Sequence, residues 1–73
     1  GLIELVGLNG KTFFLNADLI FKIEETPDTI ITLTDDRNII VKNKAIEIKK
    51  LIIEYRKEIL VESQNLNAIN KEM

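Results

Sequence analysis

The residues best suited to chemistry form two acidic clusters, one of Glu24, Glu25 and Asp28 and the other of Asp35 and Asp36. General acid–base catalysis needs two carboxyls that share a pocket and have separated pKa values, whereas neighbouring residues of a strand point to opposite faces. An EF-hand calcium loop needs a wider spacing and a distal Glu, and the second cluster runs straight into a basic residue. We therefore expect solvated turns here, and no metal site.

The remaining composition lacks the parts of the common catalytic sites. The 73 residues include no His and no Cys, so Ser–His and Cys–His nucleophiles, His/Cys zinc sites and disulfides are excluded. The segment at residues 9–11, Asn-Gly-Lys, has one glycine and does not match a phosphate-binding loop. We predict that the protein is not an enzyme and uses no cofactor.

The charge balance is nearly neutral, with ten basic and twelve acidic residues and a formal net charge of −2. A nucleic-acid-binding domain usually carries a basic stripe, and the basic residues between positions 49 and 57 are interleaved with Glu47, Glu54 and Glu58. That spacing predicts ion pairs along a solvated helix. No apolar run approaches the roughly 18 residues of a membrane span, and no signal-peptide pattern is present. We expect a cytoplasmic protein that binds no nucleic acid and does not insert into a membrane.

Two turn signals divide residues 23–42 into three short β segments. In Thr26-Pro27-Asp28 the proline presets φ at the second turn position, and Asp28 can hydrogen-bond its own backbone. Residues 35–38, Asp-Asp-Arg-Asn, tolerate the left-handed conformations that a tight hairpin needs. Between the two signals, residues 29–34 are β-branched at five of six positions, which favours a strand over a helix.

An earlier hairpin is predicted at the N-terminal end. Residues 2–8 and 11–15 read as strands joined by Asn9 and Gly10, the dipeptide typical of a two-residue type I′ turn with φ > 0 at both central positions. Asn16 is then suited to cap a single helical turn, and residues 20–25 resume the strand pattern.

A long helix is predicted to begin at Asn43, a good N-cap residue, because no Gly or Pro follows Pro27. Its apolar residues follow an alternating three-four spacing that is interrupted only at Glu62. After Ser63 several asparagines lower the helix propensity. We therefore expect one domain over residues 1–62, with residues 63–73 as a C-terminal extension that continues the helix or frays.

The predicted fold is α+β, a small five-stranded antiparallel sheet, strongly twisted or curled into a half-open barrel, followed by one C-terminal helix on one face. At 73 residues the domain lies near the lower size limit for independent folding. The side chains expected in the core come from all five strands and the helix: Ile3, Leu5, Phe13, Leu15, Phe21, Ile23, Ile31, Leu33, Ile39, Val41, Ile48, Ile52 and Tyr55.

A second apolar stripe on the predicted helix is left over after the sheet is covered. Ile46, Ile53 and Leu60 lie seven residues apart on a separate flank, with Lys49 and Arg56 between the two stripes. Lys and Arg stems can cover apolar surface, so the combined apolar arc is roughly 220°, wider than one sheet face covers. We predict that these five residues contact a second copy, as a dimer or trimer, or a different partner. The alternative is that Ile46 and Ile53 pack under a strand edge of the same chain.

Two sequence blocks resemble the FlbD/SwrD family of small flagellar and swarming motility proteins. They are residues 8–20, Leu-Asn-Gly-Lys-x-Phe-x-Leu-Asn-x-Asp-Leu-Ile, and residues 23–34, Ile-Glu-Glu-Thr-Pro-Asp-Thr-x-Ile-Thr-Leu-Thr. The similarity extends through residues 41–42 and 52–56, and departs from the usual family pattern at Ala17 and at residues 35–38. It implies a non-enzymatic flagellar accessory that supports motor or stator power, with a motor or stator protein as partner and a location peripheral to the motor.

One alternative function stays open at this stage. The strand-hairpin-strand-helix order from Phe21 to Tyr55 is also similar to the end of a LytTR-type DNA-binding domain, which would make the protein a small nucleic-acid-binding regulator. Such a domain needs basic loops, and this sequence lacks them.

Overall fold

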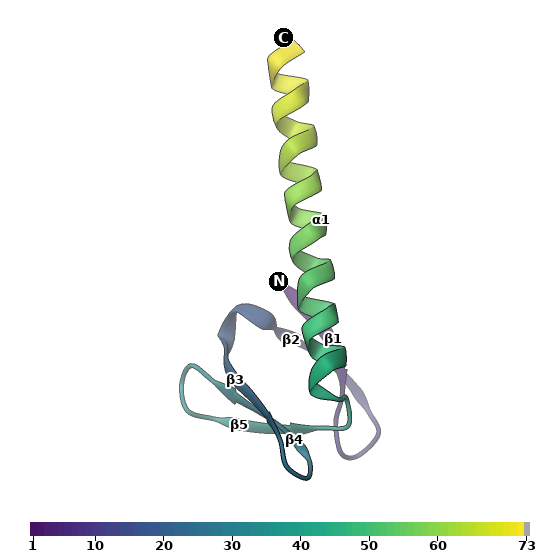
Figure 1. Cartoon of the computed structure of the whole chain (residues 1–73), viewed down its shortest axis with the longest axis vertical. Helices are drawn as coiled ribbons and strands as arrows, with labels where there is room; N and C mark the ends of the chain where they lie inside the picture. Colours follow the sequence, from purple (N-terminus) through teal and green to yellow (C-terminus); the bar gives the residue numbers. More distant parts are fainter. Residues whose placement is uncertain (73) are drawn as a thin grey trace.

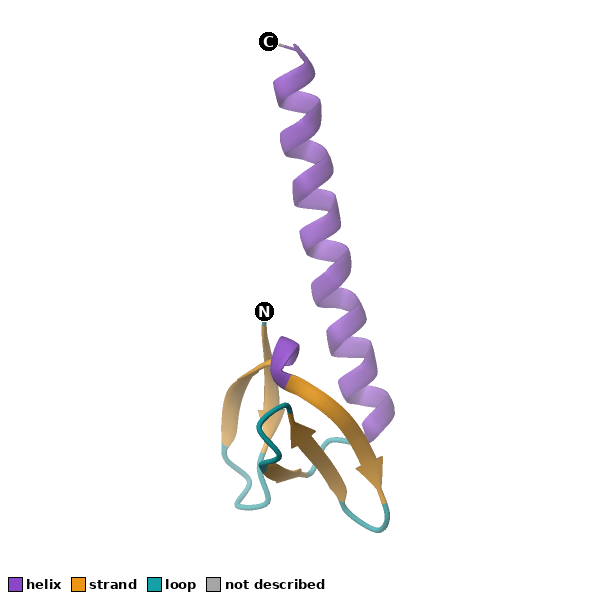
Figure 2. Ribbon diagram, turned by 90° about the vertical axis from the view of Figure 1, so that its left-hand side faces the viewer, coloured by secondary structure: helices purple, strands orange, loops and turns teal. Residues whose placement is uncertain are grey.

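The computed structural model describes the backbone of residues 1–72 and the side chains of residues 1–61. Five antiparallel strands form two sheets and are followed by one long helix (Figures 1 and 2), which confirms the predicted α+β class. The elements are β1 (Leu2–Val6), β2 (Thr12–Asn16), the 3-10 helix η1 (Ala17–Leu19), β3 (Ile20–Glu25), β4 (Thr29–Leu33), β5 (Asn38–Val41) and α1 (Ala45–Glu72).

The two sheets meet at one corner and do not close into a barrel. One sheet is the β1–β2 hairpin, and the other has the order β3-β4-β5. Gly7, directly after β1, forms an isolated antiparallel bridge with Val41 at the end of β5. Beside this bridge the N–H of Lys42 donates to the Val6 carbonyl at 2.8 Å. The half-open arrangement expected from the sequence is therefore built from two sheets that a single antiparallel bridge pairs.

A small aliphatic core lies between the sheets and the helix. Alternate strand residues point inward, and the buried apolar side chains are Ile3, Leu5, Leu15, Ile31, Leu33, Val41 and Ile48. All seven were predicted. Four further predicted core residues, Phe13, Ile23, Ile39 and Ile52, are partly buried against this cluster. Tyr55 is half-buried, and its ring lies so close to Gly1 that a side chain at position 1 would overlap it.

The prediction that Phe21 belongs to the core is wrong, because its side chain is 70% exposed. The pairing of β3 with β4 is regular from Lys22 onward, but Ile20 pairs with Leu33 while Lys22 pairs with Thr32. One extra residue, Phe21, is therefore inserted into β3 as a bulge. The insertion shifts the alternation by one step, so that Phe21 faces outward.

The first hairpin contains a three-residue loop, so the predicted two-residue type I′ turn is wrong. The N–H of Gly7 donates to the Lys11 carbonyl and the N–H of Gly10 donates to the Gly7 carbonyl, both at 2.9 Å. Gly10 has φ +80°, as predicted, whereas Asn9 is not among the described residues with positive φ. Asn9 instead accepts a hydrogen bond from the Lys11 N–H through Oδ1 at 2.9 Å. This is the three-residue hairpin whose last loop residue is left-handed.

The β4–β5 hairpin repeats the same loop with a different sequence. The N–H of Leu33 donates to the Arg37 carbonyl at 2.8 Å, and that of Asp36 donates to the Leu33 carbonyl at 3.0 Å. Asp35 Oδ1 accepts from the Arg37 N–H at 3.2 Å, as Asn9 does from Lys11. Asp36, with φ 70°, takes the place of Gly10. The two loops thus share one geometry, but only the first has glycine at the left-handed position.

The β3–β4 connection lies where the sequence predicted a turn. Residues 26–28 separate the two strands, and the Thr26 N–H donates to the Asp28 carbonyl at 3.2 Å. The Thr26–Pro27 peptide bond is cis. Pro27 and Asp28 thus lie in the connection between the two strands.

The predicted N-cap role of Asn43 is wrong, because its side chain forms a hydrogen bond with strand β1 instead of with the helix. Its Oδ1 accepts from the Val6 N–H at 2.7 Å. The carbonyl of Lys44 accepts the first hydrogen bonds of the helix, at 2.9 and 3.1 Å. The free N–H of Ala45 donates to Oε1 of Glu25, at the end of β3, at 2.8 Å. A carboxylate at this position satisfies an otherwise unpaired N–H and interacts favourably with the helix dipole.

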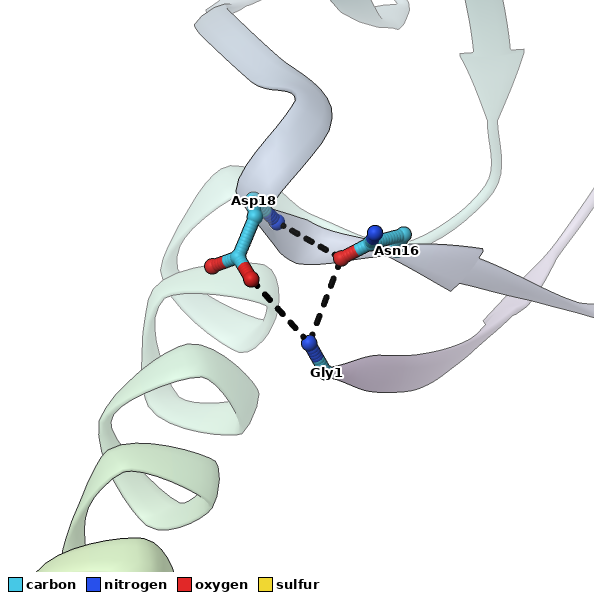
Figure 3. Close-up of polar contacts among 3 residues, drawn as sticks. All are labelled: Gly1, Asn16 and Asp18. Carbon is cyan, nitrogen blue, oxygen red and sulfur yellow. Dashed lines mark hydrogen bonds and ion pairs between the residues drawn. The ribbon is translucent and has the colours of Figure 1, made fainter.

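Asn16 caps η1, as predicted from the sequence (Figure 3). Its Oδ1 accepts from the Asp18 N–H at 3.1 Å and from the Gly1 nitrogen at 3.2 Å. The Gly1 nitrogen also lies 3.3 Å from Asp18 Oδ2. These contacts hold the start of β1 against the connector that follows β2.

Helix α1 contacts β1 and β3 and then projects beyond both sheets (Figure 1). It continues to Glu72, so the asparagines after Ser63 do not end it. The longest dimension of the molecule is 53 Å, while the other two are 24 and 18 Å. The projecting segment is therefore the main departure from a compact shape.

The paired loops predict opposite effects of two substitutions on the free energy of unfolding. Gly10→Val places a β-branched residue at φ +80° and should destabilise the protein by about 1–3 kcal/mol. The nearest atom to a new Cβ there is Lys42 Nζ at 4.0 Å, so the cost is conformational and Gly10→Asn should be much milder. Asp36→Gly should stabilise by about 1 kcal/mol, because it removes the left-handed cost. Urea denaturation measures all three, and a destabilising Asp36→Gly would contradict the shared geometry.

Candidate functional site

The Asp35–Asp36 cluster is part of a solvated turn. Asp35 Oδ2 lies 2.6 Å from Arg37 Nε, and both side chains are exposed. The backbone N–H of Arg37, which donates to Oδ1, holds the pKa of Asp35 below its ordinary value, and the Arg37 guanidinium adds to the effect. A carboxylate kept ionised in this way stabilises the loop.

The other acidic cluster also has structural partners. Glu24 pairs with Lys22 at 2.8 Å. Glu25 holds the helix N-terminus and accepts a hydrogen bond from Thr29 Oγ1 at 3.3 Å. Asp28 lies exposed in the adjoining turn. In the part of the chain that the structure describes, no three acidic residues are arranged to hold a metal ion.

Large apolar side chains are exposed over much of the described surface. Phe21, at 70%, is the most exposed of them. Exposed apolar side chains mark contact sites in soluble proteins where they lie together. The full set is Leu2, Leu8, Phe14, Leu19, Phe21, Ile40, Ile46, Ile53, Ile59, Leu60 and Val61.

Part of this surface forms an apolar groove between β3 and α1, with a volume of about 470 Å³. The lining residues are Ile20, Phe21, Lys22 and Ile23 of β3 and Ala45, Lys49, Ile52, Ile53 and Arg56 of α1, and we call this site the β3–α1 groove. Three of these residues are basic, Lys22, Lys49 and Arg56, and the others are aliphatic or aromatic. The bulge in β3 creates this groove, because the bulge turns Phe21 out of the core.

The five residues predicted as a contact surface lie on or beside this groove. Lys49, Ile53 and Arg56 line it. Ile46 and Leu60 lie outside the lining but are 54% and 58% exposed. The β3 wall was missed by sequence reasoning, because only a shift in strand pairing places Phe21 there and the sequence carries no signal for the bulge.

The charged residues of α1 are segregated around this surface. Helical geometry places Lys49 and Arg56 on one side of Ile53 and Lys50 and Lys57 on the other, each within about 60° of it. The acidic side chains of the same helix segment, at positions 47, 54 and 58, lie roughly 100–140° away. The ion pairs between described side chains all lie outside α1, so the helix pairs predicted from the sequence do not form.

Two other hollows lie on the sheets. An apolar one of about 470 Å³ lies between β2 and β5 and is lined in part by Phe14, Leu19 and Ile39. A more polar one of about 630 Å³ includes the turn residues Pro27 and Asp28. Neither contains a residue predicted to bind a partner.

The chain matches a family model described as FlbD, flagellar and swarming motility proteins, over residues 2–60. The matched region includes all five strands and the whole β3–α1 groove. No curated protein and no solved structure shows significant similarity to the chain. No helix in the described residues is long and apolar enough to span a membrane.

The register of β3 predicts a sharp difference between two apolar residues. Leu33→Ala should lower the free energy of unfolding by about 2–5 kcal/mol, since it leaves a cavity at a side chain that is 4% exposed. Phe21→Ser should change it by no more than about 0.5 kcal/mol, because the ring is largely in solvent. Chemical denaturation of both variants tests the assignment, and a Phe21→Ser variant as unstable as Leu33→Ala would show that Phe21 is buried after all.

Proposed function

Since the chain belongs to the FlbD family of flagellar and swarming motility proteins, we propose that it supports motility without catalysing a reaction, by contacting a protein of the flagellar motor or stator. The observation that supports contact is the exposed apolar β3–α1 groove, with Phe21 on its wall. A phenylalanine buried in an interface contributes roughly 1.5–3 kcal/mol. The protein would then act at the cytoplasmic side of the motor as a peripheral component.

The helix surface also supports the prediction of self-association into a dimer or trimer. Ile46, Ile53 and Leu60 repeat every seven residues, and all three are exposed. Burial of this stripe against a second helix would remove it from water.

The oligomeric state follows as a separate prediction. Light scattering at micromolar concentration should give a mass above that of the monomer, and Ile53→Glu should reduce it. Ile40→Glu is the matched control, because Ile40 on β5 is 40% exposed and Ile53 is 41% exposed. A monomer at all concentrations would rule out the homo-oligomer.

A motility assay tests the proposed function. In flagellated cells that lack the chromosomal copy, the unaltered chain should restore swarming, while Phe21→Ser and Ile53→Glu should restore much less at equal protein level. Ile40→Glu should behave like the unaltered chain. Cells that carry either of these two impaired variants and a normal number of flagella should swim more slowly than cells with the unaltered chain, since the proposed role lies in motor output.

The same assay separates this role from a nucleic-acid-binding regulator. A regulator would change the number of flagella and the flagellar transcripts, and it would not change the speed of cells that carry a normal number. Full motility of cells that lack the chain would contradict the proposed function.

A further inference from the structure

We propose that the β3–α1 groove and the helix stripe beside it bind an acidic amphipathic helix of a partner protein. The stripe consists of Ile46, Ile53 and Leu60, and we call it the apolar stripe. This inference rests on the proposed function, because it names the chemistry of the partner that the motility protein contacts.

The apolar spacing fits a helix as the ligand. The residues of the apolar stripe lie seven positions apart, roughly 10 Å along the axis of α1. Along α1 the groove extends from Ala45 to Arg56, which is about 16 Å or three helical turns. A partner helix with apolar residues at i, i+3 or i+4, and i+7 presents anchors at the same intervals.

The groove is a shallow hollow lined from two elements, which favours a protruding ligand over a flat one. Phe21 and Ile23 form one wall from β3, and Ile52 and Ile53 form the other from α1. A ridge of side chains on a helix can pack into the hollow between these two elements. The bulged Phe21 supplies an aromatic anchor of the type that dominates interface energies.

The charges specify an acidic ligand. Lys49 and Arg56 lie at the groove, and Lys50 and Lys57 lie on the other side of the apolar stripe. None of these four forms an ion pair with a described side chain. Cations therefore border the apolar stripe on both sides, with Lys49 and Arg56 between it and the aliphatic residues of the groove. This arrangement complements a helix whose apolar face is bordered by Asp and Glu.

The same charges weaken the contact with a second copy at this surface, so an acidic helix is the preferred ligand. If two helices packed antiparallel about a two-fold axis at Ile53, Lys49 of one chain would lie beside Arg56 of the other. Like charges placed together in this way cost affinity. Nucleic acid is disfavoured because the centre of the surface is aliphatic and the chain carries a net charge of −2.

The test uses the full chain, labelled with ¹⁵N, and two synthetic peptides of about 18 residues, long enough for five helical turns. Both peptides carry the same leucines at i, i+3 or i+4, and i+7, but one has Glu and the other Lys at the flanking positions. At low salt the acidic peptide should shift the amide resonances of Phe21 and Ile53 and bind at least tenfold more tightly, about 1.4 kcal/mol. The preference should shrink at about 1 M salt, where charges are screened beyond roughly 3 Å.

Charge reversal identifies the residues that produce the preference. The double variant Lys49→Glu/Arg56→Glu should lose the preference or favour the basic peptide. The matched control is Lys11→Glu/Lys42→Glu, which makes the same change in net charge at exposed residues outside the groove. The control should keep the preference for the acidic peptide.

Four results would overturn the proposal. The first is equal affinity for the two peptides, and the second is an equal loss of preference in both double variants. The third is tighter binding to phosphatidylcholine–phosphatidylglycerol vesicles or duplex DNA than to the acidic peptide, and the fourth is a self-associated chain that the acidic peptide does not dissociate. Failure here is distinguishable from failure of the proposed function. If Phe21→Ser abolishes swarming while the acidic peptide does not bind, the contact function stands and this class of partner is wrong.

Discussion

The structure depends on the corner where the two sheets and the helix meet. At this corner the Val6 carbonyl accepts from the Lys42 N–H, and the Val6 N–H donates to the Asn43 side chain. Two residues after Asn43, the N–H of Ala45 donates to Glu25, the last residue of β3. Backbone groups at such a junction need partners, and here a side chain or a carboxylate supplies them. The start and direction of α1 are thereby fixed relative to both sheets.

The direction of the helix decides which of its faces is used for folding. Ile48 is fully buried against the sheets, and the main contacts of the helix are with β1 and β3. Its first turns therefore complete a core of seven aliphatic side chains, while the flank with Ile46 and Ile53 stays exposed. In so small a domain the core cannot absorb every apolar residue, and the surplus stays on the surface.

The bulge in β3 joins this surplus to the sheet. A regular strand would have placed Phe21 among the core side chains, but the extra residue turns it toward the exposed flank of α1. Phe21 and Ile53 then line the same groove although 32 positions separate them in the sequence. The family match connects the fold to a role in motility.

The sequence by itself determined the elements, because turn chemistry and apolar periodicity act over a few residues. It located all five strands, the turn at Pro27, the cap at Asn16, the left-handed Gly10 and the long helix, and it named every residue of the aliphatic core. It also identified Ile46, Ile53 and Leu60 as apolar residues that the sheet leaves exposed.

The tertiary structure alone decided the features that require partners distant in sequence. The helix is capped by Glu25, twenty residues before Ala45 in the sequence, while the Asn43 side chain accepts a hydrogen bond from the Val6 N–H. The exposure of Phe21 follows from the register between β3 and β4, and a single extra residue reverses the facing of a side chain. Such choices depend on which backbone groups meet after the sheets assemble, and no local pattern in the sequence encodes them.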